Sequence, residues 1–136
     1  MALEEEITKA EMQGKPVIIQ LDANSKLGPE IIPGDPHPQS GNGSILADVI
    51  KRHAITVVNS LTNKCNGKLT RQRSTQVGTE ESIIDFVIVS NSLVENVEKL
   101  FIDENHEHAL VKIQKNKSEV EVKQSDHNVM ITKLDI

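Results

Sequence analysis

The sequence predicts an α/β fold because strand-like and helix-like segments alternate along its first half. Residues 17–22 form an apolar run rich in β-branched side chains, which is typical of a buried strand. Residues 45–50 carry apolar side chains at helical spacing, and residues 56–59 return to a short strand pattern. A strand, a helix and a second strand in this order usually share one sheet. We therefore expect strands 17–22 and 56–59 to lie in the same sheet.

Length and composition indicate one soluble domain over residues 1–136. The chain has 136 residues, of which 37% are hydrophobic and 26% charged, and this is enough to bury a core. No apolar run is as long as a membrane-spanning helix, and the acidic start lacks the apolar centre of a secretion signal. Cys65 is the single cysteine and cannot form an internal disulfide, which fits a reducing compartment. We expect an intracellular protein, in the cytoplasm or nucleus, with no membrane segment.

Helix formers, Gly and Pro divide the first half into segments. Good helix formers within residues 1–14 predict a leading helix. Residues 25–41 are rich in Gly and Pro, which predicts a long loop, and long ordered loops are often functional. Asn42 or Ser44 is expected to cap the second helix, which should end near His53.

The second half is predicted to consist of strands joined by polar turns. Asn-Gly supplies a tight turn at residues 65–67, and residues 76–81 are expected to form a polar loop. Extended structure is expected at residues 68–73, 82–90, 98–103, 109–115, 120–123 and 129–134.

Asp85 is a carboxylate inside the apolar run of residues 82–90. A buried carboxylate is costly unless it is paired or hydrogen-bonded, so Asp85 needs a histidine, an arginine or backbone amides as partner. The alternative is an aspartate at a sheet edge that faces water.

Two further polar groups lie at the ends of predicted strands. Asp22 and Asn24 follow the first strand, and because residues i and i+2 of an extended segment point the same way, both should face one cleft. The alternative is an Asx turn at the end of the strand. Asp126 and His127 precede the last strand. With Asp85, these groups supply the carboxylates, amide and imidazole that Mg²⁺-assisted phosphoryl chemistry uses.

The segment 64–73 is basic and contains no acid, although the chain as a whole has a formal net charge of −5. It could contact phosphate through Lys68, Arg71 and Arg73, or it could be a solvated basic face. The overall acidity, and a content of only two aromatic residues, argue modestly against tight nucleic-acid binding.

Histidines in two loops are weaker candidates. His37 could be a ligand in the long loop, and the cluster His106-Glu107-His108 suggests a zinc site, although a third ligand is not evident. A solvated loop is the competing interpretation of the cluster.

The motifs taken in order resemble a known family. They are Leu21-Asp22-Ala23-Asn24, Asn66-Gly67 followed by Thr70-Arg71, Ser82 to Ser90 around Asp85, and Ser125-Asp126-His127-Asn128. Over about residues 10–136, this order resembles the C-terminal half of the endonuclease–exonuclease–phosphatase family. The resemblance is closest to the endonuclease domains attached to non-LTR retrotransposon reverse transcriptases.

The resemblance implies half of a four-layer α/β sandwich, with one mixed β-sheet and helices on its outer face. It implies hydrolysis of DNA phosphodiester bonds with Mg²⁺ or Mn²⁺. Carried over by position, Asp22 resembles the aspartate that positions the attacking water, and Asn24 the asparagine on the scissile phosphate. Asp126 resembles a metal-associated aspartate, His127 the catalytic histidine, and Asp85 the aspartate that orients this histidine.

The chain departs from the family pattern at the metal-holding Glu of the family's first half. The acidic residues 4–6 fall on a predicted surface helix and do not match that Glu. Half of the sandwich should also expose an apolar sheet face, which predicts a C₂ homodimer through that face. Two alternatives to an active nuclease are an inactive remnant that binds nucleic acid or protein, and a phosphoesterase acting on a non-nucleic-acid phosphate.

Overall fold

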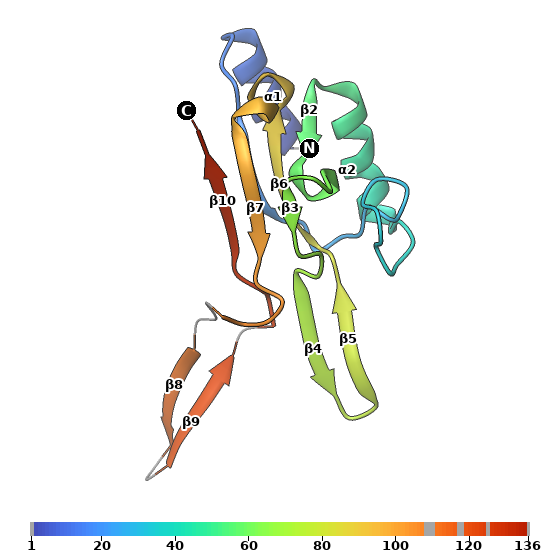
Figure 1. The fold of residues 1–136 in the computed structure, drawn as a ribbon. Coiled ribbons are helices and arrows are strands. Elements are labelled where there is room, and N and C mark those ends of the chain that lie inside the picture. Colours follow the sequence, from blue (N-terminus) through green and yellow to red (C-terminus); the bar gives the residue numbers. More distant parts are fainter. Residues whose placement is uncertain (1, 108–110, 117–118, 125, 136) are drawn as a thin grey trace.

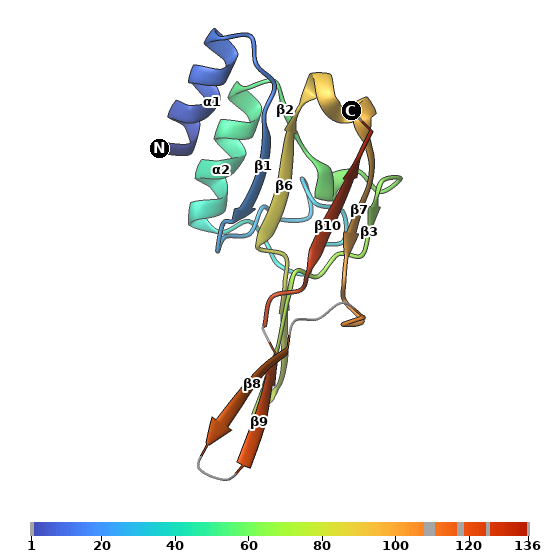
Figure 2. The ribbon, with the colours of Figure 1, turned by 90° about the vertical axis from the view of Figure 1, so that its left-hand side faces the viewer.

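Three layers make up the body of the protein in the computed structural model, which describes residues 2–107, 111–116, 119–124 and 126–135. Two helices form the first layer, and two small sheets form the second and third (Figures 1 and 2). The predicted mixture of helices and strands, an α+β fold, is confirmed. Among the described residues, neither helix is long and apolar enough to cross a membrane.

The middle layer is a three-stranded sheet in the order β1-β6-β2. Its strands are β1 (Ile18–Asp22), β2 (Ile55–Val57) and β6 (Asp85–Ser90). Both outer strands run antiparallel to β6, which lies between them. The expectation that the first two strands share a sheet is therefore confirmed.

The helices α1 (Ala2–Met12) and α2 (Gly41–Arg52) cover one face of this sheet (Figure 2). Phe86 and Ile88 of β6 belong to the core on this side, together with apolar residues of both helices. The cap of α2 is Ser40, whose Oγ accepts the N–H of Gly43 at 3.1 Å, so the prediction of Asn42 or Ser44 is wrong. Ser40 also accepts the N–H of Lys26 at 3.0 Å, and this contact across the long loop sets where the helix begins.

The second sheet covers the opposite face of β6. It has the order β10-β7-β3 and comprises β3 (Cys65–Asn66), β7 (Val97–Ile102) and β10 (Met130–Leu134). Val87 and Val89 of β6 pack against Val97, Leu100 and Ile102. Because β3 is parallel and β10 antiparallel to β7, this sheet is mixed.

The prediction of a single mixed sheet is therefore wrong: there are two three-stranded sheets and two hairpins. The reason lies in β6, whose residues 85–89 are buried on both faces and need a cover on each side. The second sheet supplies the cover that the homodimer was expected to supply. A homodimer remains a prediction, but an exposed apolar face of this sheet no longer supports it.

Two hairpins extend away from the same end of the layers (Figures 1 and 2). They are β4 (Arg71–Thr75) with β5 (Gly78–Ser82), and β8 (Val111–Asn116) with β9 (Glu119–Gln124). The polar loop expected at residues 76–81 is wrong, because residues 78–82 pair with β4 across a tight turn. The strand expected from residue 82 begins at Asp85 instead. The helical turns η1 (Val58–Ser60) and η2 (Asn91–Asn96) complete the described structure.

Gly43 fixes how closely the long loop approaches α2. A Cβ at Gly43 would clash with the backbone carbonyl of Lys26, whereas a Cβ at Gly41 would meet nothing within 4 Å. Gly43→Ala should therefore lower the free energy of unfolding by about 1–3 kcal/mol through overpacking. Helix propensity alone would raise it by up to about 1 kcal/mol.

Urea denaturation of both variants checks this prediction, with Gly41→Ala as the matched control. A stability gain in Gly43→Ala equal to that in the control would contradict it.

Candidate functional site

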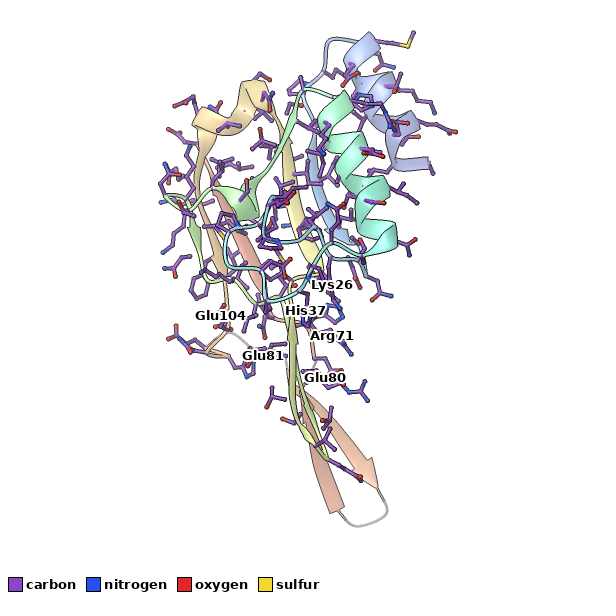
Figure 3. The ribbon with its side chains drawn as sticks, turned by 90° about the vertical axis from the view of Figure 1, so that its right-hand side faces the viewer. Lys26, His37, Arg71, Glu80, Glu81 and Glu104 are labelled. Atoms are coloured by element: carbon purple, nitrogen blue, oxygen red, sulfur yellow. The ribbon has the colours of Figure 1, made fainter. Side chains whose placement is uncertain are left out.

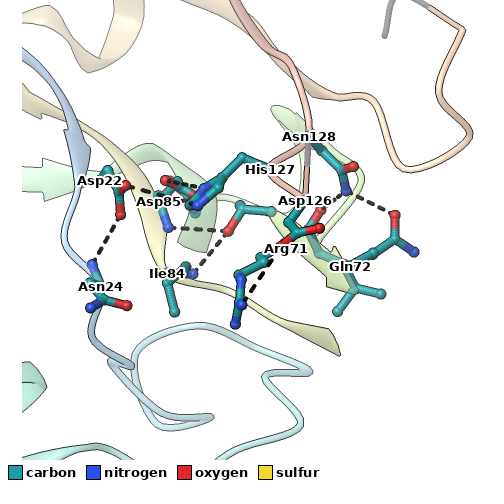
Figure 4. Close-up of polar contacts among 12 residues, drawn as sticks. Asp22, Asn24, Arg71, Gln72, Ile84, Asp85, Asp126, His127 and Asn128 are labelled. Atoms are coloured by element: carbon teal, nitrogen blue, oxygen red, sulfur yellow. Dashed lines mark hydrogen bonds and ion pairs between the residues drawn. The ribbon is translucent and has the colours of Figure 1, made fainter. Parts of the chain in front are cut away.

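Strand register brings two carboxylates side by side. Asp22 is the last residue of β1 and Asp85 the first of β6, and the two are direct partners in the antiparallel pair. They lie at the end of the sheet from which the hairpins extend, and with His127 they form the cluster in Figure 4.

His127 is the partner that Asp85 was expected to need. The ring Nδ1 lies 3.1 Å from Oδ1 and 3.0 Å from Oδ2 of Asp85, at hydrogen-bond distance from both oxygens. The side chain of Asp85 is 13% exposed and that of His127 39%. A backbone bridge between His127 and Arg71 holds the histidine against the start of β4. The histidine therefore reaches Asp85 from a distant part of the chain.

Thr70 supports Asp85 from the other side, a role that the sequence analysis missed. Its Oγ1 accepts the backbone N–H groups of Ile84 at 2.9 Å and Asp85 at 3.1 Å, and Thr70 is completely buried. The only sequence signal for Thr70 was its place in the family motif, beside Arg71. The hydroxyl supplies the acceptor for two N–H groups at the irregular entry to β6.

Burial raises the pKa of Asp85 above its usual value. Hydrogen bonds from His127 and Thr70 oppose that rise, and the nearby charge of Asp22 adds to it. The ionised form of Asp85 thus depends on its histidine partner.

Asp22 stands on the open side of the pair. Its Oδ2 is 4.0 Å from Nε2 of His127, and its side chain is 61% exposed. Asp22, Asp85 and Met130 line a cavity of about 270 Å³. The imidazole therefore has one nitrogen against Asp85 and the other toward Asp22.

Asn24 does not join this cavity wall. Its backbone N–H donates to Oδ1 of Asp22 at 3.2 Å, and its φ of 46° lies in the left-handed region. This is the Asx turn that stood as the alternative interpretation. The rule that residues i and i+2 face the same way holds only in extended backbone. Because the strand ends at Asp22, the rule does not apply to Asn24.

The cluster has a donor set that could hold a cation. One donor atom from each of Asp22, Asp85 and His127 lies within 4.8 Å of the others. Because both oxygens of Asp85 lie against His127, Asp22 is the carboxylate most open to a further ligand. Mg²⁺ often takes one or two protein carboxylates and completes its shell with substrate phosphate and water, so these residues fit such an ion.

Asp126 lies outside this three-residue cluster. Its Oδ2 is 3.9 Å from the guanidinium of Arg71, on the far side of His127 from Asp22 in Figure 4. The aspartate predicted to associate with the metal is therefore placed beside an arginine instead.

Of the three predicted phosphate-binding residues, only Arg71 lies beside the cluster (Figure 4). Lys68 reaches Gly34 of the long loop with its ammonium group. Arg73 lies farther along the hairpin, opposite Glu80.

The loop histidines make structural contacts. Nε2 of His37 donates to the carbonyl of Glu81 at 2.7 Å and so joins the long loop to β5. His106 contacts Asn128, and His108 lies outside the described residues, so the zinc interpretation remains a prediction.

No family model, curated protein or solved structure matches the chain. The resemblance to the endonuclease–exonuclease–phosphatase family therefore rests on the sequence motifs alone.

Replacing Thr70 tests its support of β6. Thr70→Val keeps the shape but leaves the buried N–H groups of Ile84 and Asp85 without their acceptor, which should cost about 2 kcal/mol or more of unfolding free energy. Thr70→Ser keeps the oxygen and serves as the control. Urea denaturation compares them, and equal stability of the two variants would refute the role.

Proposed function

We propose that this chain is an endonuclease module that hydrolyses DNA phosphodiester bonds, corresponding to the C-terminal half of the endonuclease–exonuclease–phosphatase fold. The observation that carries the proposal is the arrangement of His127. Its Nδ1 lies against both oxygens of a largely buried aspartate, and its Nε2 lies 4.0 Å from Asp22, which lines an open cavity.

In this proposal Asp85 accepts a hydrogen bond from the Nδ1–H group of His127. This hydrogen bond fixes the tautomer and the orientation of the ring. Nε2 is then the nitrogen that exchanges a proton with the substrate or stabilises negative charge on a phosphate oxygen. Nδ1 lies 3.0 to 3.1 Å from both oxygens of Asp85, which supports this assignment because an ionised carboxylate only accepts hydrogen bonds and so favours a proton on Nδ1.

Asp22 is the residue proposed to position the attacking water. Its exposed carboxylate lies 4.0 Å from Nε2 of the imidazole, so a single water beside the two groups could contact both of them. Asp22 would also hold Mg²⁺ or Mn²⁺, and Asp85 lies next to Asp22 in the strand pair. Such an ion, when bound, would neutralise phosphate charge and polarise the phosphoryl group.

DNA is the proposed substrate because of the basic segment 64–73 and the retrotransposon-type motifs. The net charge of −5 means that any attraction for DNA must be local. Arg71 is the cation placed beside His127, at the root of the β4–β5 hairpin (Figure 3).

A specific observation favours a second candidate, a domain that binds nucleic acid or protein without cleaving. Oδ2 of Asp126 lies 3.9 Å from the guanidinium of Arg71, so this aspartate lies outside the metal cluster and offsets the positive charge of Arg71.

Nicking of supercoiled plasmid DNA separates the candidates. The nuclease proposal expects Mg²⁺-dependent conversion to open circles that EDTA abolishes and that the His127→Ala variant lacks. Cleavage no greater than that of His127→Ala would favour the binding domain. If small phosphomonoesters are hydrolysed in preference to DNA, the substrate class is a non-nucleic-acid phosphate.

Asp85→Asn should reduce the nicking rate by about a hundredfold, a typical share for one proton-transfer group. The amide cannot hold the charged ring as the carboxylate does, so His127 loses its orientation. Initial rates are compared with those of Asp48→Asn, an exposed aspartate on α2. A rate equal to wild type would show that the pairing has no catalytic role.

A further inference from the structure

We propose that Asn128 is a positioning residue that holds the His127–Asp85 pair in place; the catalytic meaning of this role rests on the proposed function. Asn128 follows His127 directly and is 8% exposed. Its side chain contacts three other parts of the chain, and its contact with Gln72 lies beside the cluster in Figure 4.

The carboxamide of Asn128 has partners for both its nitrogen and its oxygen. Its Nδ2 donates to the carbonyl of Leu69 at 2.8 Å and to Oε1 of Gln72 at 2.9 Å. Its Oδ1 lies 3.1 Å from Nε2 of His106. Because Oδ1 is only an acceptor, Nε2 of His106 carries the proton and donates it. The side chain is thus fixed from three directions.

The backbone of Asn128 closes a ring of contacts around the catalytic pair. Its N–H donates to the carbonyl of Thr70 at 2.7 Å. The hydroxyl of Thr70 accepts the N–H of Asp85, and the carboxylate of Asp85 lies against His127, the residue that precedes Asn128. A shift of Asn128 therefore displaces the imidazole and the support of its carboxylate together.

The loop at residues 103–107 supports this ring from outside. Oε1 of Glu104 accepts the N–H groups of Lys68 and Leu69, both at 2.6 Å, and His106 holds Asn128. His106 and Asn128 also stand at the two ends of the segment that carries β8 and β9. Their hydrogen bond ties the base of that hairpin to the residue next to His127.

A purely structural Asn128 would change stability alone, so the test must observe the ring of His127. The probe is the Nδ1 proton of His127, observed by NMR in the whole chain and assigned by its absence in His127→Ala. In wild type the hydrogen bond to Asp85 should slow its exchange with solvent. In Asn128→Asp, which places an oxygen against two acceptors, exchange should quicken by about tenfold, or about 1.4 kcal/mol of lost protection.

Asn96→Asp is the matched control. The Nδ2 of Asn96 also donates to a backbone carbonyl, that of Asp135 at 2.7 Å, but far from the ring of contacts. It should leave the His127 proton unchanged. Asn128→Asp should also lower kcat for DNA nicking by about tenfold.

His106→Ala provides a second variant if Asn128→Asp does not fold. His106 is exposed, so its removal spares the core, and it should quicken exchange by about threefold through the loss of one of the contacts of Asn128. Unchanged exchange in every folded variant of Asn128 or His106 would overturn the proposal. Because exchange is measured without substrate, absence of nicking in wild type would count against the proposed function and not against this role.

Discussion

The structure depends on covering both faces of β6, a strand that begins with a carboxylate. Residues 86–89 are buried against helices on one side and against the second sheet on the other. Asp85 lies where this double cover ends, beside the cavity that Asp22 also lines. The position of the candidate site is thus a consequence of the layer arrangement, since the first polar residue of the most buried strand marks the edge of the core.

A carboxylate in that position is stable only with partners, and the chain supplies them from distant segments. Thr70 satisfies the backbone at Asp85, and His127 satisfies its side chain. Burial raises the pKa of Asp85 and the hydrogen bond from His127 opposes that effect, so the histidine favours the charged form of Asp85. The same contacts that stabilise Asp85 in the fold also orient the imidazole, with Nε2 4.0 Å from Asp22. Stability and the proposed chemistry therefore share one set of hydrogen bonds.

The elements with a strong local pattern were predictable from the sequence, as was the need of Asp85 for a partner. The β4–β5 hairpin was missed because its strands are polar on both faces and carry no hydrophobic period. Asn24 was misplaced because one left-handed residue ends the strand geometry. The role of Thr70 was not predictable because the N–H groups that its hydroxyl accepts are brought to it only by the fold. These misses thus concern a local hairpin without a hydrophobic pattern, a single backbone angle, and an interaction between segments that are separate in the sequence.

The charges around the cluster also favour the proposed cation, independently of the family resemblance. Asp22 and Asp85 face each other in strand register, and a phosphate approaching them would meet two carboxylates and one histidine. The nearest guanidinium, that of Arg71, already lies beside Asp126. A phosphodiester carries a negative charge of its own, so its approach to this cluster is unfavourable unless a positive ion accompanies it. Under the proposed function, a divalent cation would offset this repulsion, and Asp22 is the carboxylate most open to it.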